Sequence, residues 1–122
     1  MNKPLAFLLA LVPILMAQPN DVKAVTGILF TTVNSVLVDA NYYGGCMAQL
    51  NKTISSASPA VNCPSDWISF SCTGTYVSKD LAFFMLDQAQ LALSLNKKVK
   101  VFVDDTKKHN SYCFANRIDV IK

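Results

Sequence analysis

Four cysteines are the residues of this chain with the most definite chemistry. An even number of cysteines in a small exported domain is typical of disulfide bonds, since such a domain has a modest core and folds in an oxidising compartment. The sequence therefore predicts two disulfides, and four buried free thiols are the alternative. The residues concerned are Cys46, Cys63, Cys72 and Cys113.

Few residues are suited to catalysis. The chain has a single histidine and no glutamate, so a general acid and base would have to come from that imidazole or from aspartates. Asp104, Asp105 and His109 lie close together in the sequence and have the side-chain types of metal ligands, but a polar β-turn explains them better and is the prediction here. No Gly-x-Ser-x-Gly arrangement and no phosphate-binding glycine loop is present. We expect no enzyme, no metal site and no cofactor.

Aromatic residues are the best candidates for ligand contacts. Five of them fall at predicted strand ends or in loops, where their rings would stack on sugars or meet a partner. The alternative is that they cap the ends of the core, because tyrosine can bury its ring and leave its hydroxyl at the surface. The five are Tyr42, Tyr43, Trp67, Tyr76 and Tyr112.

The first residues are typical of a secretory signal peptide. A short positive start at Lys3 is followed by an apolar run over residues 5–16, and Ala17 or Ala24 provides a small residue for cleavage. An apolar run of about a dozen residues is too short to span a bilayer, which takes roughly twenty. We expect a signal peptide over residues 1–17, with an alternative end at 24, and one secreted or periplasmic domain over residues 18–122.

The charge balance excludes one class of partner. Ten lysines and one arginine face eight aspartates, giving a net charge of +3. Removing Lys3 with the signal lowers this to about +2, and the lysines are scattered, whereas nucleic-acid binding needs a clustered basic face. We expect no nucleic-acid partner.

Periodicity predicts five strands and one helix. The first strand has an interruption at Asn34 and Ser35, the third alternates Ile68 and Phe70 against Ser69, and Ser78 precedes the helix as a cap. Residues 51–65 read as a loop and residues 104–111 as a polar turn. The predicted strands are 26–39, 46–50, 67–72, 98–104 and 112–121, and the helix is 79–96.

The predicted helix has more apolar surface than one small sheet can cover. A helix on a sheet needs an apolar stripe of about 100° or somewhat more, and this one approaches twice that. Part of the surface therefore suggests an interface with a second chain. The residues predicted to form this interface lie at the margins of the apolar arc or beyond them: Phe83, Leu86 and Leu91.

The element order β-β-β-α-β-β is that of five-stranded barrels of the OB type, with an open α+β sheet as the alternative. In such a barrel the second and third strands are antiparallel neighbours, while the third and fifth are parallel neighbours. Of the three possible connectivities, this arrangement predicts Cys46 with Cys72 and Cys63 with Cys113.

Parts of the chain resemble a toxin family. The stretch ending Tyr-Tyr-Gly-Gly-Cys46, the stretch Phe-Ser-Cys72 and the segments 85–90 and 97–103 are similar to the B subunits of bacterial AB5 toxins of the subtilase cytotoxin type. The resemblance covers roughly residues 41–103. Residues 63–67 and 112–113 resemble small exported bacterial proteins of similar length.

The resemblance implies a non-catalytic module with an OB barrel that assembles into a pentameric ring with its helix near the axis, and that binds glycans. The family's sugar-contacting positions lie in a region where this sequence does not register with the family residue by residue, so none is carried over. The alternative role is an accessory periplasmic domain that binds another protein through its apolar helix.

Overall fold

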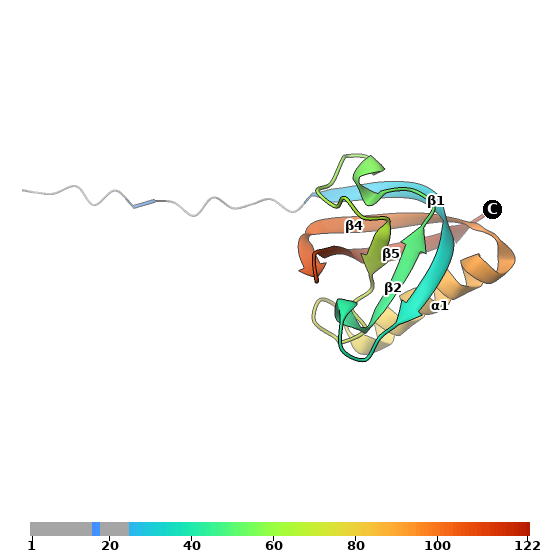
Figure 1. Cartoon of the computed structure of the whole chain (residues 1–122). Helices are drawn as coiled ribbons and strands as arrows, with labels where there is room; N and C mark the ends of the chain where they lie inside the picture. Colours follow the sequence, from blue (N-terminus) through green and yellow to red (C-terminus); the bar gives the residue numbers. More distant parts are fainter. Residues whose placement is uncertain (1–15, 18–24) are drawn as a thin grey trace, which may run out of the picture.

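Five strands and one long helix make up most of the described chain. The computed structural model describes residues 16–17 and 25–122, so the predicted signal peptide lies almost entirely outside the described residues. Two short 3-10 helices, η1 (Tyr43–Gly45) and η2 (Ile54–Ser56), follow β1 and β2. The other elements, in chain order (Figure 1), are β1 (Thr26–Val38), β2 (Cys46–Leu50), β3 (Trp67–Ser69), α1 (Lys79–Leu95), β4 (Lys98–His109) and β5 (Tyr112–Ile121).

The strands form one sheet that closes on itself in the order β1-β2-β3-β5-β4, because β4 pairs with β1 as well as with β5. β2 and β3 are antiparallel, and β3 and β5 are parallel, as the sequence predicted. The sheet is therefore closed rather than open.

β1 is one strand and not two. Its residues pair with β4 along the first half and with β2 along the second, and the register shifts between Val33 and Ser35. The interruption expected at Asn34 is a bulge that bends the strand without ending it, which is the usual effect of one extra residue in a ladder. The bend lets one strand serve two neighbours in the closed sheet.

β3 is shorter than predicted. It ends at Ser69 instead of Cys72, and Ser71 adopts a left-handed backbone with φ of 62°. Ser69 and Ser71 are both fully buried, although Ser69 pairs with Met47 of β2 and lies on the opposite face of β3 from Ile68. Ser69 Oγ donates to the carbonyl of Tyr43 at 2.7 Å, which satisfies the buried hydroxyl.

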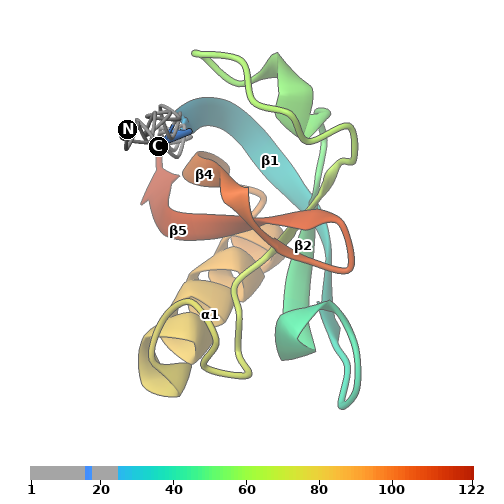
Figure 2. The same cartoon turned by 90° about the vertical axis from the view of Figure 1, so that its left-hand side faces the viewer.

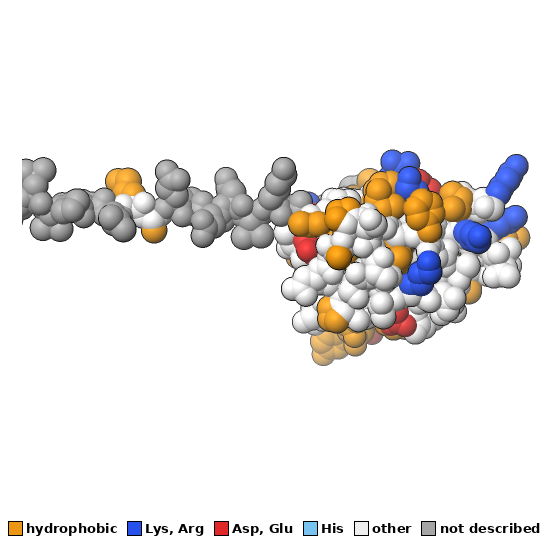
Figure 3. All heavy atoms as spheres, turned by 90° about the horizontal axis from the view of Figure 1, so that it is seen from above, with side chains coloured by type: hydrophobic (Ala, Val, Ile, Leu, Met, Phe, Trp, Pro, Cys, Tyr) orange, Lys and Arg blue, Asp and Glu red, His pale blue; other side chains and the backbone are white. Residues whose placement is uncertain are grey.

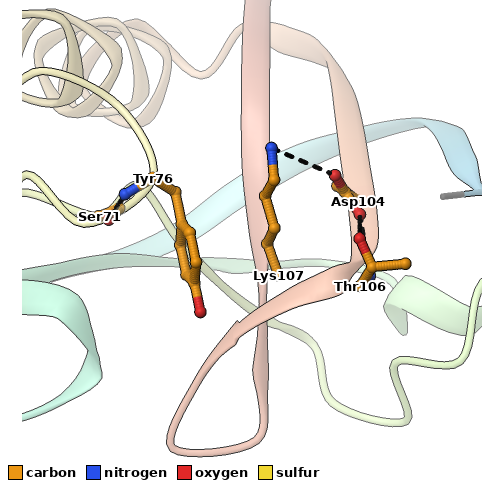
Figure 4. A network of polar contacts seen from close by, with 5 residues as sticks. All are labelled: Ser71, Tyr76, Asp104, Thr106 and Lys107. Carbon is orange, nitrogen blue, oxygen red and sulfur yellow. Dashed lines mark hydrogen bonds and ion pairs between the residues drawn. The ribbon is translucent and has the colours of Figure 1, made fainter.

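β4 continues through the predicted polar turn. It pairs with β5 as far as His109, with a register shift between Asp104 and Lys108, and the turn itself is only Asn110 and Ser111. Asp104 is buried and its Oδ1 accepts hydrogen bonds from the backbone and hydroxyl of Thr106, while Lys107 Nζ lies 3.8 Å from Oδ2 (Figure 4). These local contacts make the polar segment compatible with a strand.

α1 begins and ends where the sequence predicted, to within one residue. Ser78 Oγ accepts a hydrogen bond from the backbone of Leu81, and Asn96 ends the helix in a left-handed conformation with φ of 50°. Figures 1 and 2 show α1 lying across one end of the strands, away from the loop over residues 51–65. Its buried side chains are Ala82, Met85, Leu86, Ala89 and Ala92.

Leu86 was predicted to lie at an oligomer interface, and this is wrong. Its side chain is 3 % exposed and belongs to the core. The apolar arc of α1 is so wide that the sequence alone does not show which half faces the sheet. Phe83 and Leu91, chosen with it, are exposed.

Both predicted disulfides are confirmed. Cys46 bonds to Cys72 and Cys63 bonds to Cys113, so none of the four cysteines is free. The first links the start of β2 to the segment after β3, and the second links the loop before β3 to β5. All four side chains are buried in the core cluster.

Within the part of the chain that the structure describes, no helix is long and apolar enough to cross a membrane.

Candidate ligand-binding site

Three of the five predicted aromatic residues surround one hollow on the outside of the sheet. Tyr43, Trp67 and Tyr112 come from η1, β3 and β5, and Leu37 of β1 and Met47 of β2 complete the lining. The hollow has a volume of about 190 Å³. We call it the aromatic hollow.

Met47 forms the floor of the aromatic hollow. In β2 the side chains of Cys46, Ala48 and Leu50 belong to the core cluster, so the alternation of a strand places Met47 on the opposite, outer face. Met47 is nevertheless only 2 % exposed. An outward methionine is this well covered because the aromatic rings stand around it. A flexible thioether adapts to the shape of whatever lies on it.

The backbone around Tyr43 is fixed from both sides. Its N–H donates to Oδ1 of Asn110 at 2.8 Å, and its carbonyl accepts from Ser69 Oγ. Tyr43 has a φ of 62°, a conformation that non-glycine residues adopt rarely. These two hydrogen bonds fix the backbone from which the ring projects before any ligand arrives.

Glycine is required at position 44, beside Tyr43, because there is no space for a side chain. A Cβ at this position would lie 2.5 Å from Cδ2 of His109 and 2.7 Å from Ser69 Oγ, and φ is +71°. The 3-10 turn can therefore approach the end of β4 only with glycine here.

The rings of the cluster contact one another. Tyr43 and Tyr112 meet edge to face with centroids 5.5 Å apart, and Tyr42 lies 6.0 Å from Tyr43. Edge-to-face pairs are favourable arrangements of aromatic rings. Tyr42 is exposed and does not line the hollow, so it is a neighbour of the site rather than part of it.

Tyr76 belongs to a different environment. Its ring packs against His109 and Phe114 with centroids 4.8 Å and 5.6 Å away, and its hydroxyl donates to the carbonyl of Lys108 at 2.8 Å. It is partly buried against the core. The alternative interpretation of the aromatic residues, that they cap the core, is the correct one for Tyr76.

His109 is tied to the loop after β3. Its Nε2 lies 2.9 Å from Ser71 Oγ, which also accepts a hydrogen bond from the backbone of Tyr76, drawn in Figure 4. The serine hydroxyl has a second lone pair and a proton, so the tautomer of His109 decides which of the two groups donates in this contact. Partial burial lowers the pKa of His109 below its ordinary value.

The three residues with metal-ligand side chains do not converge. Asp104 binds Thr106, Asp105 accepts from the backbone of Asn62 at 3.2 Å, and His109 binds Ser71. Over residues 16–17 and 25–122, no group of three or more histidine, cysteine, aspartate or glutamate side chains is placed to hold a metal ion.

Basic side chains on the outer face of β4 and β5 are engaged with aromatic rings. Lys100 Nζ lies 5.6 Å from the ring of Phe30 and 5.0 Å from that of Phe102, and Arg117 lies 4.6 Å from Phe102. Arg117 also donates to both carboxylate oxygens of Asp119, and these hydrogen bonds raise the pKa of the Arg117 guanidinium. Figure 3 shows hydrophobic and basic side chains side by side on one face of the molecule. Cation–π contacts of this kind stabilise a sheet surface.

In comparisons with known proteins, no family model, no curated protein and no solved structure matches the chain.

Proposed function

We propose that this protein is a non-catalytic carbohydrate-binding module and that the aromatic hollow holds one sugar unit of a glycan. The observation that supports it most is the convergence of Tyr43, Trp67 and Tyr112 on one preorganised hollow. Rings held in advance lose little conformational entropy on binding, so more of the contact energy appears as affinity.

The size and chemistry of the hollow fit a sugar ring. Pockets for drug-sized ligands measure roughly 300–1,000 Å³, and this one, at about 190 Å³, suits a smaller group such as a monosaccharide. Aromatic faces cover the apolar C–H side of a sugar, while tyrosine hydroxyls and the indole N–H are hydrogen-bonding groups for its hydroxyls. The hollow has no charged side chain in its lining, which favours a neutral glycan over an anionic one.

The compartment and the fold family are part of the proposal. Two disulfides are compatible with an oxidising compartment, and we propose a secreted or periplasmic protein of bacterial origin. The closed sheet with a helix between the third and fourth strands supports an OB-type barrel, the fold implied by the resemblance to AB5 toxin B subunits. Glycan binding is also what that resemblance implies.

A glycan array tests the proposal. We expect the oxidised wild-type protein to bind a defined set of glycans, and Trp67→Ala and Tyr112→Ala to bind the same set at least about tenfold more weakly, the loss that corresponds to about 1.4 kcal/mol of stacking energy. Tyr42→Ala is the matched control, because this exposed tyrosine does not line the hollow. A folded wild-type protein that binds no glycan would refute the proposal.

A second candidate is an accessory domain that binds a protein through α1. The exposed apolar residues of that helix support it, and they include Phe84, which is 64 % exposed. Substitutions on α1 that abolish the biological role of the protein and leave the hollow intact would favour this candidate over the first.

A further inference from the structure

One face of α1 carries an exposed row of side chains that we call the α1 stripe. It consists of Leu81, Phe84, Gln88, Leu91 and Leu95, all of them exposed. At 100° per residue these five positions fall within an arc of about 80°, beside the face that packs on the sheet. Four large apolar side chains in a single row are more than scattered surface exposure explains.

The spacing of the α1 stripe points to a helix as its partner. The residues recur at intervals of three, four, three and four, which is the a and d pattern of helices that pack along their length. Lys79, the one lysine of α1, lies on the opposite side of the helix, so no lysine interrupts the stripe. Beside it runs a groove of about 350 Å³ between α1 and β5, which is lined in part by Met85, Asn116 and Arg117.

Gln88, in the middle of the α1 stripe, indicates that the partner is a second copy of this chain. An amide that is buried against apolar side chains costs free energy unless it finds a hydrogen-bonding partner. A second Gln88 supplies both a donor and an acceptor, since each amide has an NH₂ group and a carbonyl. A single polar residue at an a position is also the feature that fixes register and two-chain assembly in paired helices.

We propose that the α1 stripe is the interface of a twofold dimer of this chain, in which the two α1 helices pack in parallel and the two Gln88 amides hydrogen-bond to each other. This surface is separate from the aromatic hollow, so the inference goes beyond the proposed function and does not depend on it.

Charge distinguishes the parallel from the antiparallel arrangement. Asp80 and Asp87 lie along one edge of the stripe, and the uncharged groove side of α1, with Met85, lies along the other. Parallel helices keep the acidic edges of the two copies on opposite sides of the pair. Antiparallel helices centred on Gln88 would instead place Asp87 beside the same residue of the second copy, and like charges at this spacing repel.

Charge pairs at Gln88 test the dimer in the full oxidised protein. We expect wild type to have twice the monomer mass by light scattering. Gln88→Glu and Gln88→Lys should each raise the dimer dissociation constant at least tenfold, and an equimolar mixture of the two should regain dimers. Gln90→Glu and Gln90→Lys are the matched controls, because Gln90 is exposed on the same helix but outside the stripe, and both should remain dimeric.

Three results would overturn the dimer. The first is a wild-type protein that stays monomeric at hundreds of micromolar. The second is a mass of five copies, which the ring implied by the toxin resemblance requires. The third is an equimolar mixture of the two charge variants that stays monomeric. Since Gln88 is exposed, each variant should keep the near-ultraviolet circular dichroism of wild type. A variant that loses both its dimers and this native spectrum would also count against the inference.

Engineered cysteines test the helix direction. In a parallel pair Leu81→Cys forms a disulfide with the same position of the second copy, whereas in an antiparallel pair it bonds to Leu95→Cys of the partner. We expect the first product from the single variant, and none from Phe83→Cys, which is exposed outside the stripe. Cross-linking only in a mixture of Leu81→Cys with Leu95→Cys would overturn the parallel arrangement.

Discussion

The aromatic hollow and the α1 stripe are both exposed apolar surfaces, but they are built in opposite ways. The hollow is recessed, its floor residue Met47 is buried, and the backbone of Tyr43 is fixed by two hydrogen bonds. The α1 stripe projects from a regular helix, and its side chains are exposed. A recessed, fixed surface suits a small ligand, whereas a projecting row suits a second helix. Apolar area alone therefore does not indicate what a surface binds.

The disulfides support only one of the two regions. Cys46 precedes Met47 and Cys113 follows Tyr112, so both bridges end next to residues of the hollow, whereas α1 carries no cysteine.

Replacing Cys63 and Cys113 with alanine should lower the free energy of unfolding by about 4 kcal/mol, and replacing Cys46 and Cys72 should lower it by about 3.5 kcal/mol. The first loss is larger because the Cys63–Cys113 bridge closes the longer loop. Urea unfolding measures both, and equal stability of either variant and wild type would contradict the account.

Truncating the floor of the hollow should be the next largest effect. Met47→Ala removes a side chain that is buried although it lies on the outer face, and we expect a loss of about 2–5 kcal/mol in the free energy of unfolding. Ligand binding should weaken with it, because the rings lose the surface on which they rest. A loss below about 0.5 kcal/mol would mean that Met47 is not covered as described. Urea unfolding of the variant, with glycan binding measured on the folded fraction, checks both outcomes.

His109 should make stability depend on pH. Its pKa in the folded state is lower than the ordinary value of 6.5, so as the pH falls the unfolded chain takes up the proton first. Stability should therefore decrease as the pH drops below about 6.5 and should stop changing from this source below the folded-state pKa. His109→Gln keeps an acceptor for the Ser71 hydroxyl but does not titrate, so urea unfolding between pH 5 and 8 should show a flatter profile. An unchanged profile would exclude His109 as the source.

Truncation on the α1 stripe should have the smallest effect on folding. Phe84→Ser removes a ring that one chain leaves mostly exposed, so the stability of the isolated monomer should change by less than about 0.5 kcal/mol. Unfolding at low protein concentration, where the monomer dominates, measures this. A loss of several kcal/mol there would show that Phe84 supports the fold of the single chain, in contrast to Met47.

The sequence predicted correctly those features that depend on residues close together in the chain or on the order of the elements. The helix over residues 79–95 has an uninterrupted apolar period and Ser78 as its cap, and the order of strands was enough to pair Cys46 with Cys72 and Cys63 with Cys113. The short strand Cys46–Leu50 was also predicted with its observed bounds. Each of these needed only periodicity, capping or topology.

Long-range contacts explain what the sequence did not show. Residues 104–111 have a polar composition that is typical of a turn, yet Lys108 pairs with Cys113 and its backbone carbonyl accepts a hydrogen bond from the Tyr76 hydroxyl. Met47 was missed because an apolar residue in a short strand gives no sign of the face it occupies. Tyr76 was grouped with the hollow on residue type alone, and only the fold places it against His109 and Phe114.

The most direct test of the aromatic hollow uses the single tryptophan of the chain. Because Trp67 lines the hollow, titration with a glycan identified on the array should change its fluorescence in a saturable way, with the same dissociation constant that calorimetry gives, and Tyr42→Ala should behave as wild type. A glycan that binds by calorimetry and leaves the emission of Trp67 unchanged would show that sugars bind elsewhere, which would contradict the account.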